Sequence, residues 1–152
     1  HHVGLLSEAG MPAVADPGSS VVRAAHDLNL KVVPLVGPVS LLLALAASGL
    51  NGQNFAFVGY LPQDTAERAA RVKQLENLAQ RTGQTQLWIE TPYRNAAMLS
   101  TLVQGLQGST RLAIASGLTL ATASIQSHSV GQWKKGIKGP DGHTPAVYAI
   151  GP

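Results

Sequence analysis

Hydrophobic and polar positions along the chain follow two spacings, one typical of strands and one typical of helices. Near the N-terminus, apolar runs at residues 3–6 and 31–36 predict two buried strands. Between them, apolar residues at helical spacing over residues 21–28 predict a helix. Residues 41–47 are apolar at every position, so we expect a second helix that is buried on most sides.

The remaining chain repeats the same alternation of strands and helices. Residues 54–60 alternate as a strand does, and Asp64 and Glu67 have the spacing of a capping box at the start of a long helix. The predicted apolar stripe of that helix is Ala69, Val72, Leu75, Leu78 and Ala79. Its charged residues are expected to face water: Arg68, Arg71, Lys73 and Glu76. Further strands are predicted at residues 85–89, 111–115, 124–129 and 146–150, with a helix along Leu99, Leu102, Val103 and Leu106.

The order of these elements predicts an α/β protein of two lobes. The boundary is expected near Asn51, which gives a first lobe of residues 1–51 and a second lobe of residues 52–152. Because several strands follow one another near the C-terminus, the second lobe is expected to contain a mixed sheet.

Composition narrows the class of protein without identifying it. Of the 152 residues, 45% are hydrophobic and only 12% are charged, so a packed core is expected and disorder is not. The chain has no cysteine, which excludes disulfides and thiolate chemistry. No apolar run is long enough to span a membrane and no secretory signal is visible, so we expect a cytoplasmic protein.

The loop at residues 7–18 is the first candidate for chemistry. Its small residues follow a predicted strand, and open α/β sheets hold ligands at the carboxyl ends of their strands. A plain strand-loop-helix connection would need the same residues, since Asp-Pro-Gly is a common turn. No dinucleotide or nucleoside-triphosphate fingerprint is present.

Four short motifs in series resemble the tetrapyrrole methylase superfamily. The branch they are most similar to is the ribosomal RNA small subunit methyltransferase I group. The motifs are residues 7–12 with 16–18, residues 37–38 ahead of 41–50, residues 57–62, and residues 90–94.

The resemblance implies two α/β lobes, with S-adenosylmethionine in the cleft between them, and a homodimer. It also implies that family members have opening strands before His1, so we expect a fragment whose first lobe is truncated. The residues that would contact the cofactor are Ser7, Glu8, Ala9, Pro12, Val39, Ser40, Glu90 and Leu118. A methyl transfer from a sulfonium needs mainly positioning of the cofactor. No catalytic residue and no metal site is therefore predicted.

Departures from the family pattern leave the methyl acceptor open. Ser116, Gly117 and Leu120 stand where the ribosomal branch has charged residues, and Tyr93 replaces a histidine. RNA is one candidate acceptor, and we expect poor activity on the substrate of the ribosomal branch. The alternatives are a methylase of a small tetrapyrrole-like substrate, and a non-catalytic module for ligand binding or dimerisation.

Several charged residues have plain structural interpretations as well. Glu90 suits the N-terminus of the helix that follows it, and Arg94, four residues later, is positioned to pair with it. Lys134, Lys135 and Lys138 form the one basic cluster, with a solvated turn as the default interpretation and phosphate contact as the minor one.

Overall fold

A computed structural model describes all 152 residues, and these divide into two compact units, residues 1–40 and 41–152. Each unit is described by itself. The predicted lobes, 1–51 and 52–152, stay a prediction. None of the helices is both long and apolar enough to cross a membrane.

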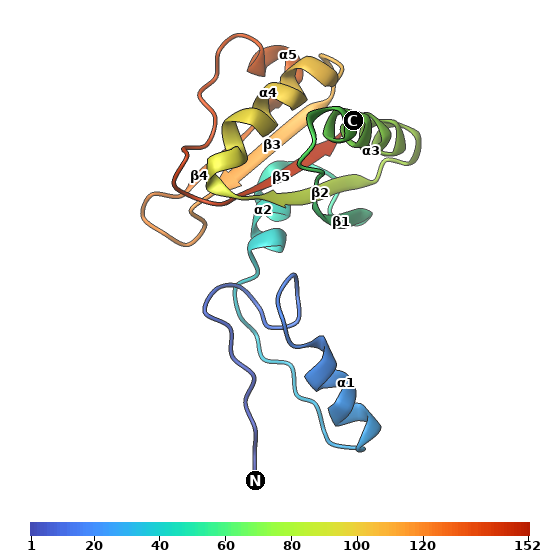
Figure 1. Cartoon of the computed structure of the whole chain (residues 1–152), viewed down its shortest axis with the longest axis vertical. Helices are drawn as coiled ribbons and strands as arrows, with labels where there is room; N and C mark the ends of the chain where they lie inside the picture. The colour runs from blue at the N-terminus through green and yellow to red at the C-terminus, as the bar shows by residue number, and fades with distance from the viewer. The chain divides into compact units, whose positions relative to one another are not determined.

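The first unit contains one regular element, helix α1 (Ser19–Asp27), which confirms the helix predicted there (Figure 1). The strands predicted at residues 3–6 and 31–36 are wrong, because neither segment pairs with another. A strand needs a neighbour for its backbone N–H and C=O groups, and its own apolar run cannot supply one. Many large apolar side chains of this unit are consequently exposed, with Val3 and Leu6 above 90%.

The second unit is built on a five-stranded mixed sheet in the order β1-β2-β5-β3-β4 (Figure 1). Strands β1 and β2 are parallel and the other neighbours are antiparallel. A mixed sheet was predicted, and it is confirmed. The strands are β1 (Phe55–Tyr60), β2 (Thr85–Glu90), β3 (Arg111–Ser116), β4 (Ser124–Ser129) and β5 (Ala146–Gly151). The helices are α2 (Ser40–Ser48), α3 (Thr65–Thr82), η1 (Pro92–Arg94), α4 (Asn95–Gly105) and α5 (Val130–Trp133).

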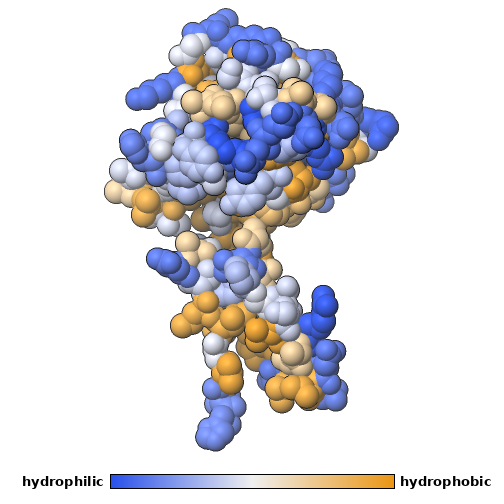
Figure 2. Space-filling model, viewed as in Figure 1, coloured by the Kyte–Doolittle hydropathy of each residue, from blue (hydrophilic) through white to orange (hydrophobic).

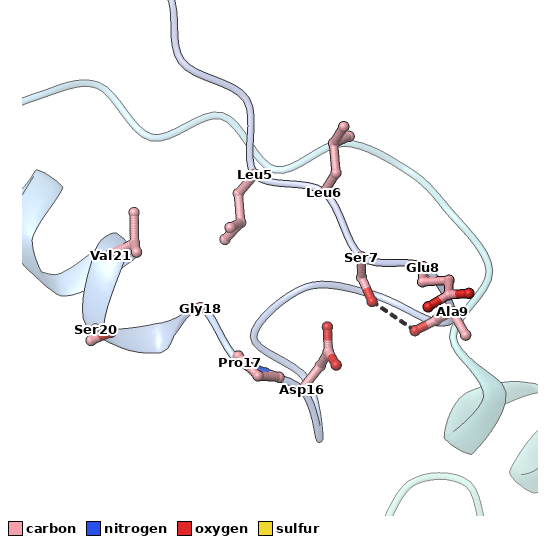
Figure 3. A pocket seen from close by; sticks show the side chains of 10 residues that line it. All are labelled: Leu5, Leu6, Ser7, Glu8, Ala9, Asp16, Pro17, Gly18, Ser20 and Val21. Atoms are coloured by element: carbon pink, nitrogen blue, oxygen red, sulfur yellow. Dashed lines mark hydrogen bonds between the residues drawn. The ribbon is translucent and has the colours of Figure 1, made fainter.

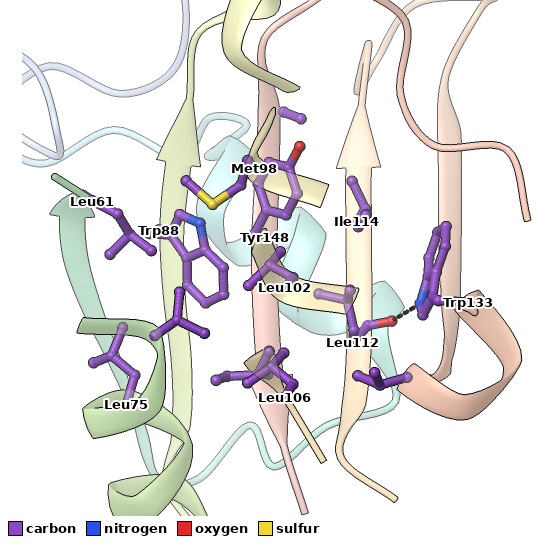
Figure 4. Close-up of a cluster of buried hydrophobic side chains, with 14 residues drawn as sticks. Leu61, Leu75, Trp88, Met98, Leu102, Leu106, Leu112, Ile114, Trp133 and Tyr148 are labelled. Atoms are coloured by element: carbon purple, nitrogen blue, oxygen red, sulfur yellow. Dashed lines mark hydrogen bonds between the residues drawn. The ribbon is translucent and has the colours of Figure 1, made fainter. Parts of the chain in front are cut away.

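The main core lies between the sheet and helices α3 and α4 (Figure 4). Trp88 of β2 and Tyr148 of β5 stack there with ring centroids 5.7 Å apart and an interplanar angle of 8°. Leu102 of α4 and Leu112 of β3 are fully buried beside them. Period-two alternation places Trp88, Tyr148 and Leu112 on one face of the sheet, so one set of residues defines this core.

Helix α2 is less buried than its sequence predicts. Leu41 and Leu45 are buried, but Leu42 and Leu43 are 49% and 37% exposed. Its C-terminal end contacts the sheet through Ser127 of β4, whose hydroxyl donates to the Ser48 carbonyl over 2.6 Å. The expectation of burial on most sides is therefore wrong, because the second unit covers one side of the helix.

Helix α3 begins and ends where the sequence predicts, but its buried face differs. Asp64 accepts hydrogen bonds from the backbone N–H groups of Ala66 and Glu67, which confirms it as the cap, but Glu67 makes no return bond, so the predicted capping box is only half formed. Arg68 and Glu76, predicted to face water, are 6% and 0% exposed. Residues 68, 72 and 76 recur at intervals of four, so both charged side chains share a face with buried Val72.

Candidate cofactor-binding site

The loop of residues 7–18 in the first unit is tightly folded on its own backbone. The Ser7 hydroxyl donates to the Ala9 carbonyl over 2.8 Å, and the Ala13 N–H donates to the Pro17 carbonyl over 3.2 Å. Four residues adopt positive φ values, namely Gly10 at 78°, Ala13 at 66°, Ala15 at 54° and Gly18 at 138°. Only small residues occupy these turns, which leaves the backbone accessible to a ligand.

A pocket of about 590 Å³ lies within this loop and the start of α1 (Figure 3). Its lining comprises Leu5, Leu6, Ser7, Glu8, Ala9, Asp16, Pro17, Gly18, Ser20 and Val21. The volume falls in the range of small-molecule sites, roughly 300–1,000 Å³. The structure therefore brings three predicted site residues, Ser7, Glu8 and Ala9, around one hollow.

Gly18 lines the pocket, and a larger residue at this position would require the Leu5 side chain to move. Gly18 has a φ of 138°, and a Cβ at this position would lie 2.7 Å from Leu5 Cδ2. The neighbouring Asp16 lines the same pocket, although we did not predict it as a site residue. The sequence feature that could have indicated Asp16 is the Asp16-Pro17-Gly18 turn, but the same residues are equally typical of a purely structural turn.

The other predicted residues of the N-terminal motifs do not line this pocket. Pro12 is half-buried and lies outside it. Val39 is 8% exposed, and Ser40 is exposed as the first residue of α2. Their predicted role in cofactor binding stays a prediction.

In the second unit, Glu90 lies at the carboxyl end of β2 and is 1% exposed. Its Oε1 accepts from the Thr91 backbone N–H over 2.8 Å and from the Thr91 hydroxyl over 3.3 Å. Its Oε2 lies 3.0 Å from Arg94 Nη2, without the alignment of a hydrogen bond. The predicted pairing of Glu90 with Arg94 is therefore confirmed as an ion pair.

Arg94 connects the carboxyl ends of the two parallel strands. Its Nη2 also donates to the carbonyls of Leu61 and Pro62, over 3.2 Å and 3.4 Å, in the loop that follows β1. The residues before these contacts, Tyr60 and Tyr93, are 59% and 76% exposed. The Glu90–Arg94 pair thus fixes a turn whose outer surface carries two accessible aromatic rings.

The Tyr148 hydroxyl lies close enough to Glu90 for the carboxylate charge to act on its pKa, and it stays protonated. Burial, and then the negative charge of Glu90, raise the pKa of the Tyr148 hydroxyl well above its usual range. The protonated hydroxyl donates to Asn95 Oδ1 over 3.1 Å. Asn95 in turn donates to the carbonyls of Asp141 and Thr144. This buried network orders the turn before β5.

Leu118 lies in the turn between β3 and β4 and is half-buried. The flanking residues Gly117 and Thr119 have φ values of 60° and 72°. The turn is closed by the Leu120 N–H, which donates to the Gly117 carbonyl over 2.9 Å. The structure contains no group of three or more His, Cys, Asp or Glu side chains that could hold a metal ion.

Two curated proteins with similar sequences carry the same name. The chain is 39% identical over 117 residues to the ribosomal RNA small subunit methyltransferase I of Mesorhizobium japonicum, and the match covers 77% of this chain and 38% of that protein. It is 36% identical over 124 residues to the protein of the same name from Vibrio cholerae, covering 82% and 42%. The predicted resemblance is confirmed. The chain is related to the ribosomal RNA small subunit methyltransferase I group.

Solved structures confirm the fold class. The methyltransferase CobJ matches 93% of this chain and 61% of its own with a TM-score of 0.57 at 16% identity. Uroporphyrin-III-C-methyltransferase from Thermus thermophilus matches 93% and 60% with a TM-score of 0.52 at 18% identity. No protein-family profile matches the chain. The chain spans about two fifths of the length of the curated relatives named above.

Proposed function

We propose that this protein is an S-adenosylmethionine-dependent methyltransferase that acts on RNA in the cytoplasm. The observation that carries the proposal is the sequence match to ribosomal RNA small subunit methyltransferase I, at 39% and 36% identity over most of the chain. The tetrapyrrole enzymes share the fold at 16% and 18% identity, which does not favour a tetrapyrrole as acceptor. RNA is therefore the acceptor that the similarities support better.

The cofactor assignment rests on the chemistry of the pocket in the 7–18 loop, which we call the loop pocket. S-adenosylmethionine would supply a methyl group on a positively charged sulfonium. The pocket offers two carboxylates, Glu8 and Asp16, and opposite charges attract. Ser7 and Ala9 add a hydroxyl and accessible backbone groups, which suit the polar parts of such a ligand. The same ligand is proposed to contact Pro12, Val39 and Ser40, because these residues lie in the motifs that resemble the family.

Glu90 and Leu118 are assigned to the cofactor from the second unit. Glu90 is buried and forms an ion pair with Arg94, so its proposed role is to hold this turn in place. Leu118 offers backbone groups in a turn that two positive-φ residues shape. Neither side chain is placed as a general base, and we assign no catalytic residue.

The exposed apolar surface of the first unit supports a homodimer. Val3, Leu6, Leu35 and Val36 are each at least 80% exposed, and Figure 2 shows the orange colour of apolar residues on this part of the chain. Contiguous apolar patches on monomeric proteins rarely exceed a few hundred Å². A second copy of the protein is the partner proposed to cover this surface, and light scattering on the native protein should then give the mass of a dimer.

Calorimetry tests the cofactor assignment. We expect the native protein to bind both S-adenosylmethionine and S-adenosylhomocysteine. Glu8→Gln should weaken binding of S-adenosylmethionine more than binding of S-adenosylhomocysteine, because the second ligand lacks the sulfonium charge. Glu67→Gln, which removes an exposed carboxylate from α3, is the control and should change neither affinity. A folded protein that binds neither ligand at millimolar concentration would contradict the methyltransferase proposal.

A further inference from the structure

Charge is distributed unevenly along the second unit. Residues 91–140 contain no aspartate and no glutamate, but they contain Arg94, Arg111, Lys134, Lys135 and Lys138. Arg94 is half-buried and pairs with Glu90, whereas the other four cations take part in no salt bridge. About a third of this mildly basic chain thus carries positive side chains and no negative one.

All four cations belong to segments that pair with β4, contact it or follow it in the chain, and β4 is an edge strand of the sheet. Arg111 lies opposite Ser129 in the β3–β4 pair, and its Nη1 donates to the Ser127 carbonyl over 3.0 Å. Lys138 contacts the same strand through its backbone, because its carbonyl accepts from Gln126 Nε2 over 2.9 Å.

Lys134 and Lys135 complete the group because α5 continues directly from the end of β4. All four cationic side chains are exposed. We name the set of Gln126, Lys134, Lys135 and Lys138 the β4 surface, because Arg111 shares the Ser127 face of the sheet and Gln126 lies on the opposite one. Besides its cations it presents an amide side chain, and the strand itself is rich in serine.

The backbone that carries the lysines is held firmly. The buried Trp133 donates from Nε1 to the Leu112 carbonyl over 2.9 Å, and Ser129 and Gln132 form a capping box at the start of α5. Further along, Ile137 packs against the core, and Gly139 lies so close to Leu99 that a Cβ there would clash with Leu99 Cδ2. Binding through these lysines would therefore order side chains but little backbone.

The nearest acidic residue along the chain forms no ion pair with this surface. Asp141 follows Lys138 by three positions, but its Oδ1 accepts from the backbone N–H groups of His143 and Thr144 over 3.0 Å and 2.8 Å. These bonds, with the His143 N–H first, keep the pKa of Asp141 below its usual value. The carboxylate is thus engaged in its own turn, and it forms no ion pair with Lys138.

We propose that the β4 surface binds the phosphate backbone of the RNA acceptor. Lys, Arg, Ser and Gln side chains are the groups that contact nucleic-acid phosphates, and such contacts orient a substrate without reading its sequence. A surface of one sign also raises the local concentration of a polyanion. The inference rests on the proposed function, and it assigns substrate orientation to residues other than Glu90 and those that line the pocket of the 7–18 loop.

Fluorescence anisotropy of a labelled oligouridylate against the native protein tests the proposal. The test variant is Lys135→Gln with Lys138→Gln, and the matched control is Arg71→Gln with Arg81→Gln, which removes two cations from α3 instead. Each phosphate contact on a single strand contributes about 0.7 to the slope of log K against log salt. Loss of two contacts should lower that slope by about 1.4 and weaken binding about 25-fold at 0.1 M salt. The control pair should change both quantities far less.

Three results distinguish the possibilities. Each single substitution, Lys135→Gln or Lys138→Gln, should weaken binding about fivefold at 0.1 M salt, which supports the proposal even if the double variant folds poorly. Equal effects of the test and control pairs would overturn it, because net charge alone would then explain binding. A native protein that binds S-adenosylhomocysteine but no oligouridylate would overturn both the β4 surface and RNA as acceptor, while the methyl-donor assignment would survive.

Discussion

Replacing Glu76 with alanine should be one of the most destabilising changes in the second unit. The Glu76 side chain is fully buried, and its Oε1 accepts from the Gln107 backbone N–H over 2.7 Å and from the Thr110 hydroxyl over 2.6 Å. Its Oε2 lies 2.6 Å from Lys73 Nζ. One carboxylate therefore ties α3 to the connection between α4 and β3.

The magnitude follows from what the alanine variant leaves behind. Hydrogen bonds to a charged group contribute about 1.5–3 kcal/mol each, and the donors of Gln107 and Thr110 would lose their acceptor. Lys73 is 48% exposed and can turn to water, so its lost ion pair adds little. The buried Thr110 hydroxyl and the partly buried Gln107 N–H without an acceptor give an expected loss of about 3–5 kcal/mol. Glu76→Gln keeps an acceptor oxygen and should cost only about 1 kcal/mol.

Chemical denaturation followed by tryptophan fluorescence measures these differences. Trp88 and Trp133 are both buried in the second unit, so their emission reports its unfolding. Glu67→Ala removes an exposed carboxylate from the same helix and should change stability by no more than about 0.5 kcal/mol. If Glu76→Ala cost no more than Glu67→Ala, the network inferred around Glu76 would contribute nothing, and the reasoning would be refuted.

Three further predictions concern the same unit. Burial opposes ionisation of Glu76, but hydrogen bonds from Lys73, Thr110 and Gln107 outweigh it and lower the pKa below its usual 4.5. The native protein should therefore be more stable than Glu76→Gln by the full amount above about pH 4.5. This difference in stability should shrink as the pH falls through the lowered pKa, and urea titrations at several pH values measure it. Trp133→Phe removes the N–H donor to a buried carbonyl and should cost at least about 1 kcal/mol in the same titrations; an unchanged midpoint would count against that bond. Gly83 has a φ of 69°, so Gly83→Ala should destabilise the protein by about 1 kcal/mol. Gly105 has no such constraint and open space around it, so Gly105→Ala should stabilise the protein slightly. Effects of the same sign for the two variants would contradict this prediction.

Parts of the site could be predicted because their signals are local. The pairing of Arg94 with Glu90 follows from a spacing of four residues, and the small residues of the 7–18 loop indicate an accessible backbone whatever surrounds it. The inclusion of Asp16 in the pocket could not be predicted, because it depends on how the loop folds back toward Ser7. The Arg94 contacts to Leu61 and Pro62 likewise join segments that are distant in sequence.

The sequence by itself determined the regular elements from β1 to β5 and the Asp64 cap, because alternation and capping depend on neighbours within a few residues. Tertiary structure alone decided that β5 enters the sheet between β2 and β3, since strand pairing joins residues far apart in the chain. It also decided that Glu76 is buried, because the donors that make its burial tolerable come from another segment. Residues 3–6 are apolar but form no strand, because an apolar run becomes a strand only where a neighbouring strand pairs with it.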